Sequence, residues 1–321
     1  MSLECFFNEL SLRPIAANVN GARERMSHFV KTLARINSVA KKQLPLRVSE
    51  EFFNAKLASD YPLDRWRNDI GVDTDIRKYF RSIATKSPLL EPGELKERAS
   101  QCEARCGGEL AIGILAAFLA DGLTISISSE PRWDCTTLRA AISEIDVNAT
   151  ITDSEELLFH VSKPEHVNGH RKWIGERTSV QFADHFELWG CRAAKFPSLE
   201  FCEHVQSQIT ALPWNGPQLK QVIKRLEMLD QWWGDGCGRK LSIDYRIKEA
   251  PCKLTPESQA TLVQFADQHT FMCPDGKRRR FSWHARFTPG AGRIYLTWET
   301  EDEKLLIGHI GKHLPTVEHP H

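Results

Sequence analysis

The first half of the chain alternates between segments with helical spacing of apolar residues and segments with strand-like alternation. Over residues 14–43, apolar side chains recur at helical spacing opposite basic ones, which predicts a helix that ends before Pro45. Residues 94–120 predict a long helix, which the glycine pair at 107–108 can kink or split. The other elements expected here are a strand over 123–128, a helix over 138–145 and a strand over 157–161.

The second half predicts helices followed by three short strands. Helices are expected over 196–212, 218–233 and 255–268, with a strand over 241–247. From Arg280 onward, three strand-like runs are separated by a Pro-Gly turn and an acidic turn, which predicts an antiparallel meander.

These elements predict an α+β fold with two domains. Residues 1–178 are expected to form a mainly helical domain with a small sheet, which regulates the second domain, binds a partner or recognises a target. Residues 179–321 are expected to form an α+β domain in which helices pack on the antiparallel meander.

Composition places the chain among ordinary globular proteins, with 41% hydrophobic and 26% charged residues. The formal net charge is zero, which argues against a protein that coats nucleic acid non-specifically. Residues 239–293 nevertheless carry eleven Lys and Arg against five Asp and Glu, so positive charge gathers before and within the meander. The most apolar run, 110–119, has about half the length that a membrane-spanning helix needs, and the N-terminus lacks the pattern of a signal peptide. We therefore expect a cytoplasmic protein with no membrane contact.

No cofactor or metal is expected from the motifs. The nine cysteines are irregularly spaced and are expected to be reduced thiols, and Cys102 and Cys106 lack the second close pair that is usual in zinc sites. His166 and His170 would share one face of a helix, but the Asn-Gly between them disfavours a regular helix. A polar contact between domains or with nucleic acid is preferred to metal binding for this histidine cluster, and a plain surface position is preferred to both. Phosphate-binding and dinucleotide-binding glycine motifs and the serine-hydrolase elbow are absent from the sequence.

The meander resembles the C-terminal half of RelE/ParE-superfamily toxins, which are small α+β proteins of bacterial toxin–antitoxin systems. The likeness rests on Gly292-Arg293-Ile294-Tyr295-Leu296, on the Leu-Leu-Ile run at 305–307, and on the Lys-His pair at 312–313. It covers about 60 residues, roughly 255–314. Ribonuclease members of that family cleave RNA without a metal, whereas ParE-like members act on DNA gyrase, so the fold alone does not specify the chemistry.

The resemblance implies roles for particular residues. Arg293 would stabilise the charge on the phosphorane, His313 would be the general acid, and Arg286 and Lys312 would be auxiliary cations. Family members often carry a glutamate ahead of the meander as the base, and no carboxylate is matched to it here. Asp275 and His284 remain the candidates for the base.

Other interpretations of these residues stay open. Arg293 can instead pair with Glu299 or Glu301 on its own hairpin, Tyr295 can be a half-buried strand residue, and His313 can lie in an exposed tail. The basic run consists of Lys277, Arg278, Arg279 and Arg280. It is either a solvated turn or a nucleic-acid contact in which Phe281 and Trp283 stack on bases.

The expected function is that of a metal-independent, ribonuclease-like toxin or effector of a bacterial toxin–antitoxin or anti-phage defence system. Its partners would be RNA or another nucleic acid, and a protein that neutralises it or forms a complex with it. The alternative is a non-enzymatic subunit of a multi-protein defence complex that holds nucleic acid or protein on the same basic surface.

Overall fold

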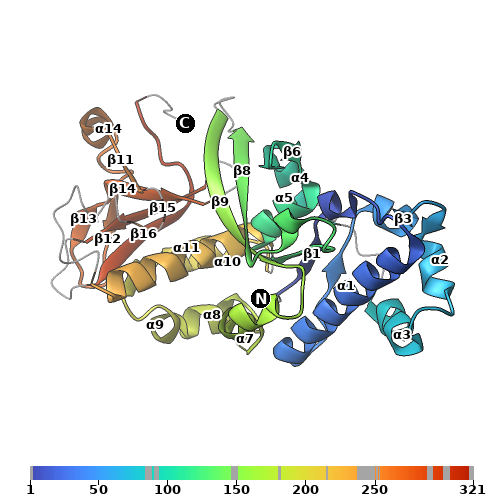
Figure 1. Cartoon of the computed structure of the whole chain (residues 1–321). Coiled ribbons are helices and arrows are strands. Elements are labelled where there is room, and N and C mark those ends of the chain that lie inside the picture. The colour runs from blue at the N-terminus through green and yellow to red at the C-terminus, as the bar shows by residue number, and fades with distance from the viewer. Residues whose placement is uncertain are drawn as a thin grey trace. The chain divides into compact units, whose positions relative to one another are not determined.

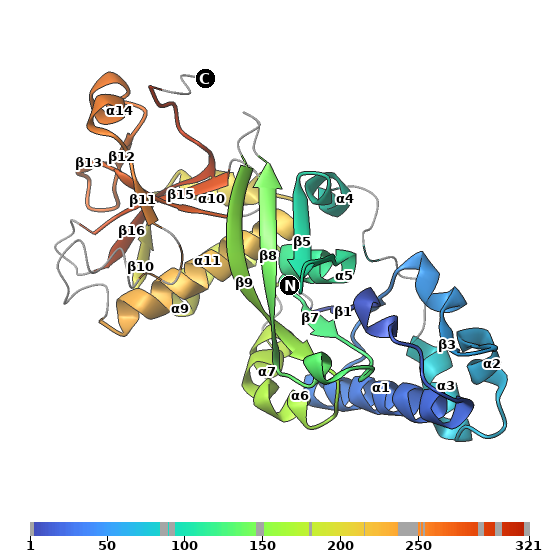
Figure 2. The ribbon, with the colours of Figure 1, turned by 45° about the horizontal axis from the view of Figure 1, so that its top comes forward.

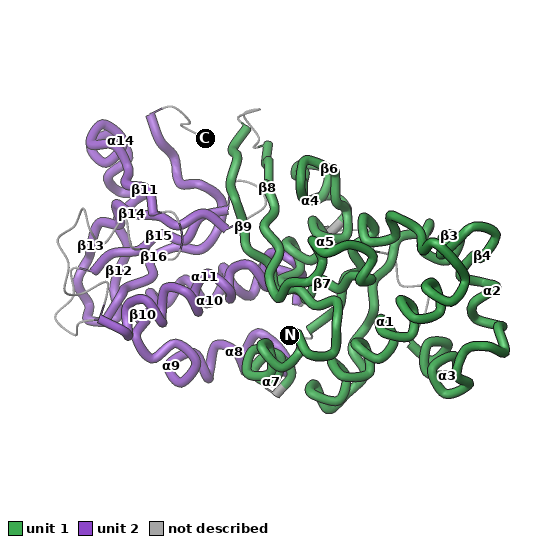
Figure 3. The backbone as a smooth tube through the Cα atoms, viewed as in Figure 1, with its two compact units in different colours: residues 1–181 green, residues 182–321 purple. Residues whose placement is uncertain are grey.

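The computed structural model describes residues 3–83, 89, 94–145, 151–179, 182–214, 216–236, 250, 252, 254–287, 292–298 and 304–317. The chain divides into two compact units, residues 1–181 (unit 1) and residues 182–321 (unit 2) (Figure 3). Both units combine helices with a mixed sheet, as the α+β class predicts.

Unit 1 mixes strands and helices along the chain (Figure 1). Its strands are β1 (Cys5–Phe7), β2 (Leu46–Arg47), β3 (Lys56–Ala58), β4 (Tyr61–Pro62), β5 (Cys102–Cys106), β6 (Glu109–Leu110), β7 (Leu123–Ile125), β8 (Thr137–Ile145) and β9 (Ile151–Val161). Its helices are α1 (Val19–Ala40), α2 (Leu63–Asn68), α3 (Thr74–Ile83), α4 (Glu94–Ala99), α5 (Ile112–Ala120), α6 (His166–Gly169) and α7 (Arg171–Ser179), with 3-10 turns η1 (Glu9–Leu12), η2 (Glu50–Asn54) and η3 (Pro131–Trp133).

The main sheet of unit 1 has seven strands in the order β2-β1-β7-β9-β8-β5-β6, which is larger than the small sheet expected. Strands β2, β1, β7 and β9 pair in parallel, whereas β8, β5 and β6 join them antiparallel. Alternate side chains of β1 enter different cores, because successive residues of a strand face opposite sides. Phe7 packs with α1 and α3, and Phe6 packs with α5.

Two predicted helices of unit 1 are wrong. The segment expected as one helix over 94–120 contains α4, the hairpin β5–β6 and the buried helix α5. Gly107 and Gly108 adopt positive φ angles of 60° and 84°, so they form the hairpin turn and split the segment rather than kink a helix. Residues 137–145 are the strand β8, which pairs along its whole length with β9 (Figure 2). The helix expected over 14–43 is confirmed as α1, and the strand over 157–161 is confirmed within β9.

Unit 2 begins with helices, and most of its strands lie in its C-terminal half. The helices are α8 (His185–Gly190), α9 (Arg192–Lys195), α10 (Val205–Thr210), α11 (Pro217–Gly234) and α14 (Gln259–Gln264). The strands are β10 (Leu199–Phe201), β11 (Leu254–Pro256), β12 (Thr270–Met272), β13 (Arg278–Arg280), β14 (Trp283–Arg286), β15 (Gly292–Thr297) and β16 (Leu305–Lys312).

The meander predicted from the sequence is confirmed as β14, β15 and β16, which pair antiparallel in that order. Two short strands that the sequence did not predict extend it to five strands in the order β10-β16-β15-β14-β11. Strand β10 pairs in parallel with β16, so the sheet is mixed. The helices expected over 196–212 and 255–268 are therefore shorter, because each segment contributes a strand and a short helix.

Helix α11 packs against this sheet with an apolar side and confirms the helix expected over 218–233. It begins at Pro217, a residue suited to the first helical position because its fixed φ matches the helix. Leu219, Leu226 and Leu229 are buried on one side of it, and the helix contacts β10 and β16 (Figure 1). The strand expected over 241–247 lies outside the described residues. A search of the described helices finds none long and apolar enough to cross a membrane.

Candidate functional site

The pairing of β11, β14 and β15 brings polar side chains to one face of the unit 2 sheet. His284 on β14 pairs with Thr255 on β11 and with Tyr295 on β15. Arg286 pairs with Arg293 in the next position of the same face, two residues along each strand. Because side chains at i and i+2 point to the same side of a strand, the sheet itself collects these four residues of β14 and β15.

Glu257 joins the same face at the end of β11. It lies two residues after Thr255, and its backbone N–H donates to the Ser282 carbonyl at 2.8 Å, which continues the pairing with β14. Only 6% of its side chain is exposed. Its Oε1 lies 2.9 Å from His284 Nδ1 and 3.8 Å from His313 Nε2. The carboxylate is therefore held next to two imidazoles, away from bulk water.

Tyr295 connects the strands of the site to the segment after β16. Its hydroxyl donates to Glu257 Oε1 at 2.9 Å and accepts from the Leu314 N–H at 3.2 Å. The same hydroxyl lies 3.3 Å from His313 Nδ1. Tyr295 is fully buried, so it is a structural centre of the site rather than a half-buried strand residue.

Four histidine rings surround the Tyr295 ring. The centroids of His269, His284, His309 and His313 lie between 5.2 and 6.1 Å from that of Tyr295. Two of these rings have clear structural tasks. His269 Nε2 lies 3.0 Å from the Pro315 carbonyl, and His309 contacts Gln208 through Nδ1 and the Lys312 carbonyl through Nε2. The other two, His284 and His313, face Glu257.

Burial and charge shift the pKa values in this site. Burial lowers the pKa of His284 and of His313, and the nearby Arg293 lowers both further, while Glu257 acts in the opposite direction. Burial alone raises the pKa of Glu257, but the adjacent His284 and the Tyr295 hydroxyl outweigh it, so the net shift is downward. The site thus combines an ionised carboxylate with imidazoles that favour the neutral form.

The predicted cations Arg293, Arg286 and Lys312 differ in how far their side chains are exposed. Arg293 is 9% exposed, and its Nη1 donates to the Gly292 carbonyl at 3.0 Å. Its predicted alternative partners, Glu299 and Glu301, lie outside the described residues. Arg286 is half-buried, and Lys312 is exposed at the end of β16.

The interpretation that His313 lies in an exposed tail is wrong. It follows β16, its side chain is 24% exposed, and its Nδ1 lies 2.7 Å from the Leu314 carbonyl. Asp275 is not part of this group. Its carboxylate accepts two hydrogen bonds from Arg279, at 2.6 and 2.5 Å, and Arg279 holds its pKa down at about 2.

The basic run forms a separate hairpin made by β12 and β13. Lys277, Arg278 and Arg280 are exposed there, whereas Arg279 is turned toward Asp275. Phe281 is fully buried against Phe271 and so cannot stack on a base. Trp283 is half-buried, with its ring 5.3 Å from that of Trp298.

Glu257 is the residue that sequence reasoning missed. The segment 255–268 reads as one helix, so a carboxylate at 257 is assigned to a helix end rather than to a sheet. The available signal was Ser258, whose hydroxyl accepts from the Thr261 N–H and caps α14, which places the helix start after Glu257.

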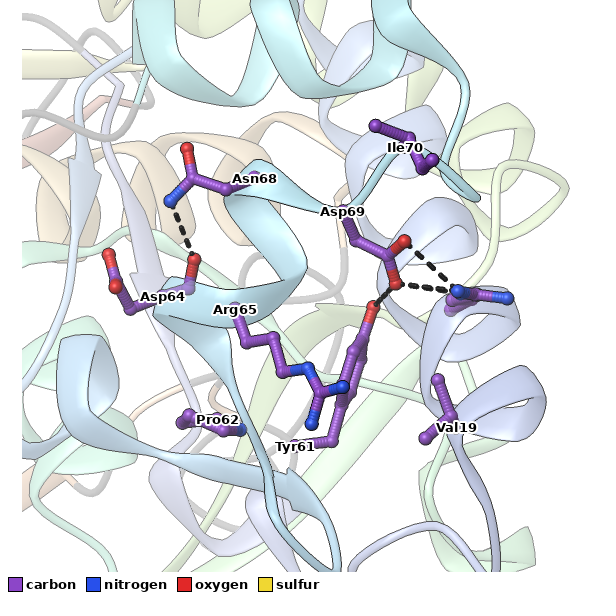
Figure 4. A pocket seen from close by; sticks show the side chains of 9 residues that line it. Val19, Tyr61, Pro62, Asp64, Arg65, Asn68, Asp69 and Ile70 are labelled. Atoms are coloured by element: carbon purple, nitrogen blue, oxygen red, sulfur yellow. Dashed lines mark hydrogen bonds and ion pairs between the residues drawn. The ribbon is translucent and has the colours of Figure 1, made fainter.

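Unit 1 contains a second candidate, an open hollow of about 540 Å³ beside α2 (Figure 4). At its wall, the Tyr61 hydroxyl donates to Asp69, and Arg23 donates to both carboxylate oxygens at 2.8 and 3.0 Å. These groups satisfy one another, which is typical of a structural network. Two histidines of unit 1 are also engaged, because His166 contacts Asp134, and His170 contacts the carbonyls of Thr136 and His160.

Comparisons with protein-family models, with characterised proteins and with solved structures give no match for this chain.

Proposed function

We propose that unit 2 cleaves RNA without a metal and that the chain is a ribonuclease-like toxin or effector. The observation that carries the proposal is the group formed by Glu257, His284 and His313 on the sheet face that also bears Arg293. It supplies the carboxylate that the resemblance to RelE-like ribonucleases required and that the sequence did not reveal.

The residues divide the proton transfers between them. Glu257 accepts the proton of a ribose 2′-hydroxyl, and the 2′-oxygen then attacks the adjacent phosphorus. The bond from phosphorus to the 5′-oxygen breaks, and His313, which must start this step as the imidazolium, donates its Nε2 proton to that leaving oxygen. Burial lowers the pKa of His313, which makes its imidazolium a stronger acid. The products are a 2′,3′-cyclic phosphate and a free 5′-hydroxyl, and the step leaves Glu257 protonated and His313 neutral. Arg293 and Arg286 stabilise the negative charge that develops on the phosphorane.

The β12–β13 hairpin supplies the RNA-binding surface in this proposal. Lys277, Arg278 and Arg280 are exposed and positively charged, and Lys312 is exposed at the end of β16. Contacts from such side chains to phosphates are independent of base sequence. Substrate selection then falls to unit 1 or to a partner.

The cellular setting follows from the chemistry. An unrestrained ribonuclease would damage its own cell, so a neutralising or complex-forming protein partner is part of the proposal. The chain then acts in the bacterial cytoplasm, as one component of a toxin–antitoxin or anti-phage defence system.

Expression in bacteria tests the proposal. Wild type, Glu257→Gln and His313→Asn are produced at matched soluble levels, and growth and RNA integrity are followed. Asp275→Asn is the matched control, because it removes a carboxylate that Arg279 engages outside the site. We expect wild type and the control to arrest growth and degrade RNA, and the two site variants to do neither. Harmless wild-type expression with intact RNA contradicts the proposal.

Burial of the site favours one alternative. Glu257 is 6% exposed and Arg293 is 9% exposed, which is little for groups that must reach a substrate. A non-enzymatic subunit that holds nucleic acid or protein on the β12–β13 hairpin would need no such access. In that case RNA binding is weakened by Arg278→Ala and unaffected by Glu257→Gln, and no cleavage product forms.

A further inference from the structure

Three potential metal ligands converge in unit 2. The atoms are Glu257 Oε1, His284 Nδ1 and His313 Nε2, which all lie within 4.8 Å of one another. The first lies 2.9 Å from the second and 3.8 Å from the third. Ligands of a tetrahedral zinc ion, each at 2.0–2.1 Å from the metal, are separated by about 3.3 Å. These two distances lie on either side of that value, and the third pair of ligand atoms lies within 4.8 Å, so small side-chain movements bring the three atoms to zinc-binding separations.

The hydrogen bonds of the site leave His284 Nδ1 and His313 Nε2 available as metal ligands beside Glu257. His284 is 92% buried, and its Nδ1 has no hydrogen-bond partner among the described residues, because the close Glu257 oxygen lies outside hydrogen-bond geometry. His313 Nδ1 donates to the Leu314 carbonyl at 2.7 Å, so in the neutral ring the lone pair is on Nε2. That lone pair faces the Glu257 carboxylate. A cation between them replaces this repulsion with attraction.

We propose that Glu257, His284 and His313 bind a zinc ion. One carboxylate and two imidazoles form a donor set that zinc uses in sites with an open fourth position. The outer contacts also fit, since metal-binding histidines usually donate their other ring N–H to a carbonyl or carboxylate. His313 does so to Leu314, and the Tyr295 hydroxyl orients Glu257.

Zinc at this position would inhibit RNA cleavage, a consequence that rests on the proposed function. The ion occupies the Glu257 oxygen that accepts a proton and the His313 nitrogen that donates one. Zinc binding itself is independent of that function and is measured without RNA.

Calorimetric titration of the full chain with zinc tests the site. Wild type, Glu257→Gln and His313→Asn are compared, with Cys191→Ser as the control because Cys191 is an exposed thiol. Loss of one ligand should weaken binding at least about 100-fold, because changes to outer contacts alone cost 10–100-fold. The control should bind as wild type does.

X-ray absorption of the wild-type zinc complex tests the same site without any variant. Nitrogen and oxygen neighbours at about 2.0–2.1 Å are expected, whereas sulfur neighbours at about 2.3 Å would place the ion on thiols and overturn the proposal. Wild-type affinity in both site variants, or no binding by wild type, also overturns it. Zinc binding without any RNA cleavage would refute the proposed function and leave the metal site intact.

Discussion

Replacing Tyr295 with phenylalanine removes one hydroxyl from the centre of the site and keeps the buried ring. That hydroxyl donates to Glu257 Oε1 at 2.9 Å and accepts from the Leu314 N–H at 3.2 Å. The substitution therefore leaves a buried carboxylate with one donor fewer and a backbone N–H without its acceptor. Apolar packing around the ring should be unchanged.

The expected loss of unfolding free energy follows from these two contacts. A hydrogen bond to a charged group contributes about 1.5–3 kcal/mol, and a buried donor left unsatisfied costs about 1–3 kcal/mol. The total should be smaller than the sum of these two free energies. The segment of His313 and Leu314 is partly exposed, so water can replace part of the lost hydrogen bonding. We therefore expect Tyr295→Phe to destabilise unit 2 by about 3 kcal/mol.

Urea denaturation and amide hydrogen exchange measure this effect. Tyr79→Phe is the matched control, because the Tyr79 hydroxyl accepts a single neutral hydrogen bond, from Asn37 at 2.8 Å, and should cost about 1 kcal/mol. Exchange protection of the Leu314 amide should fall in Tyr295→Phe and stay unchanged in the control. A loss below about 0.5 kcal/mol with normal Leu314 protection would refute the assigned role of this hydroxyl.

Two further predictions concern unit 1. Gly113→Ala should destabilise the protein by at least about 2 kcal/mol, because the new Cβ would lie 2.0 Å from the Phe7 carbonyl oxygen. Gly175→Ala is the control, because its Cβ meets open space and alanine should stabilise α7 slightly. Equal effects of the two substitutions in thermal unfolding would contradict this prediction. Asp69→Asn should be less stable than wild type at pH 7, because Tyr61 and Arg23 lower the carboxyl pKa to about 2. The stabilisation by the ionised Asp69 carboxylate is complete above the unfolded pKa of about 3.9 and is lost as the pH falls through about 2. The difference in unfolding free energy between the two proteins should therefore narrow over that range. A constant difference in acid unfolding would count against the prediction.

The sequence predicts those parts of the fold whose pattern is local. Helices α1 and α11 follow from the helical spacing of buried residues, and the meander follows from three apolar runs separated by turn residues. Strand β8 was predicted as a helix, although Leu138, Ala140 and Ile142 alternate and all face the core. Ala140 and Ala141 favour a helix, whereas the alternation of buried and exposed residues is the two-residue period of a strand.

The candidate site was only partly predictable because its parts come together through long-range pairing. Arg293, Tyr295 and His313 belong to the meander, so their grouping is visible in the sequence. Glu257 reaches them through β11, a strand of three residues that is too short to show a periodic pattern and that forms by pairing with β14. Strand β10 is equally short and pairs with β16 from about a hundred residues away, so the mixed character of the sheet was not predictable either.

The most direct test of the central claim is RNA cleavage by the purified full chain in the presence of EDTA, with analysis of the product ends. Comparison of wild type with Glu257→Gln and the Asp275→Asn control isolates the assigned base. We predict that wild type and the control yield 2′,3′-cyclic phosphate and 5′-hydroxyl ends and that Glu257→Gln loses at least about 100-fold in rate, the size of effect typical of a general base. Cleavage by Glu257→Gln at the wild-type rate, or no cleavage by wild type, would contradict the account.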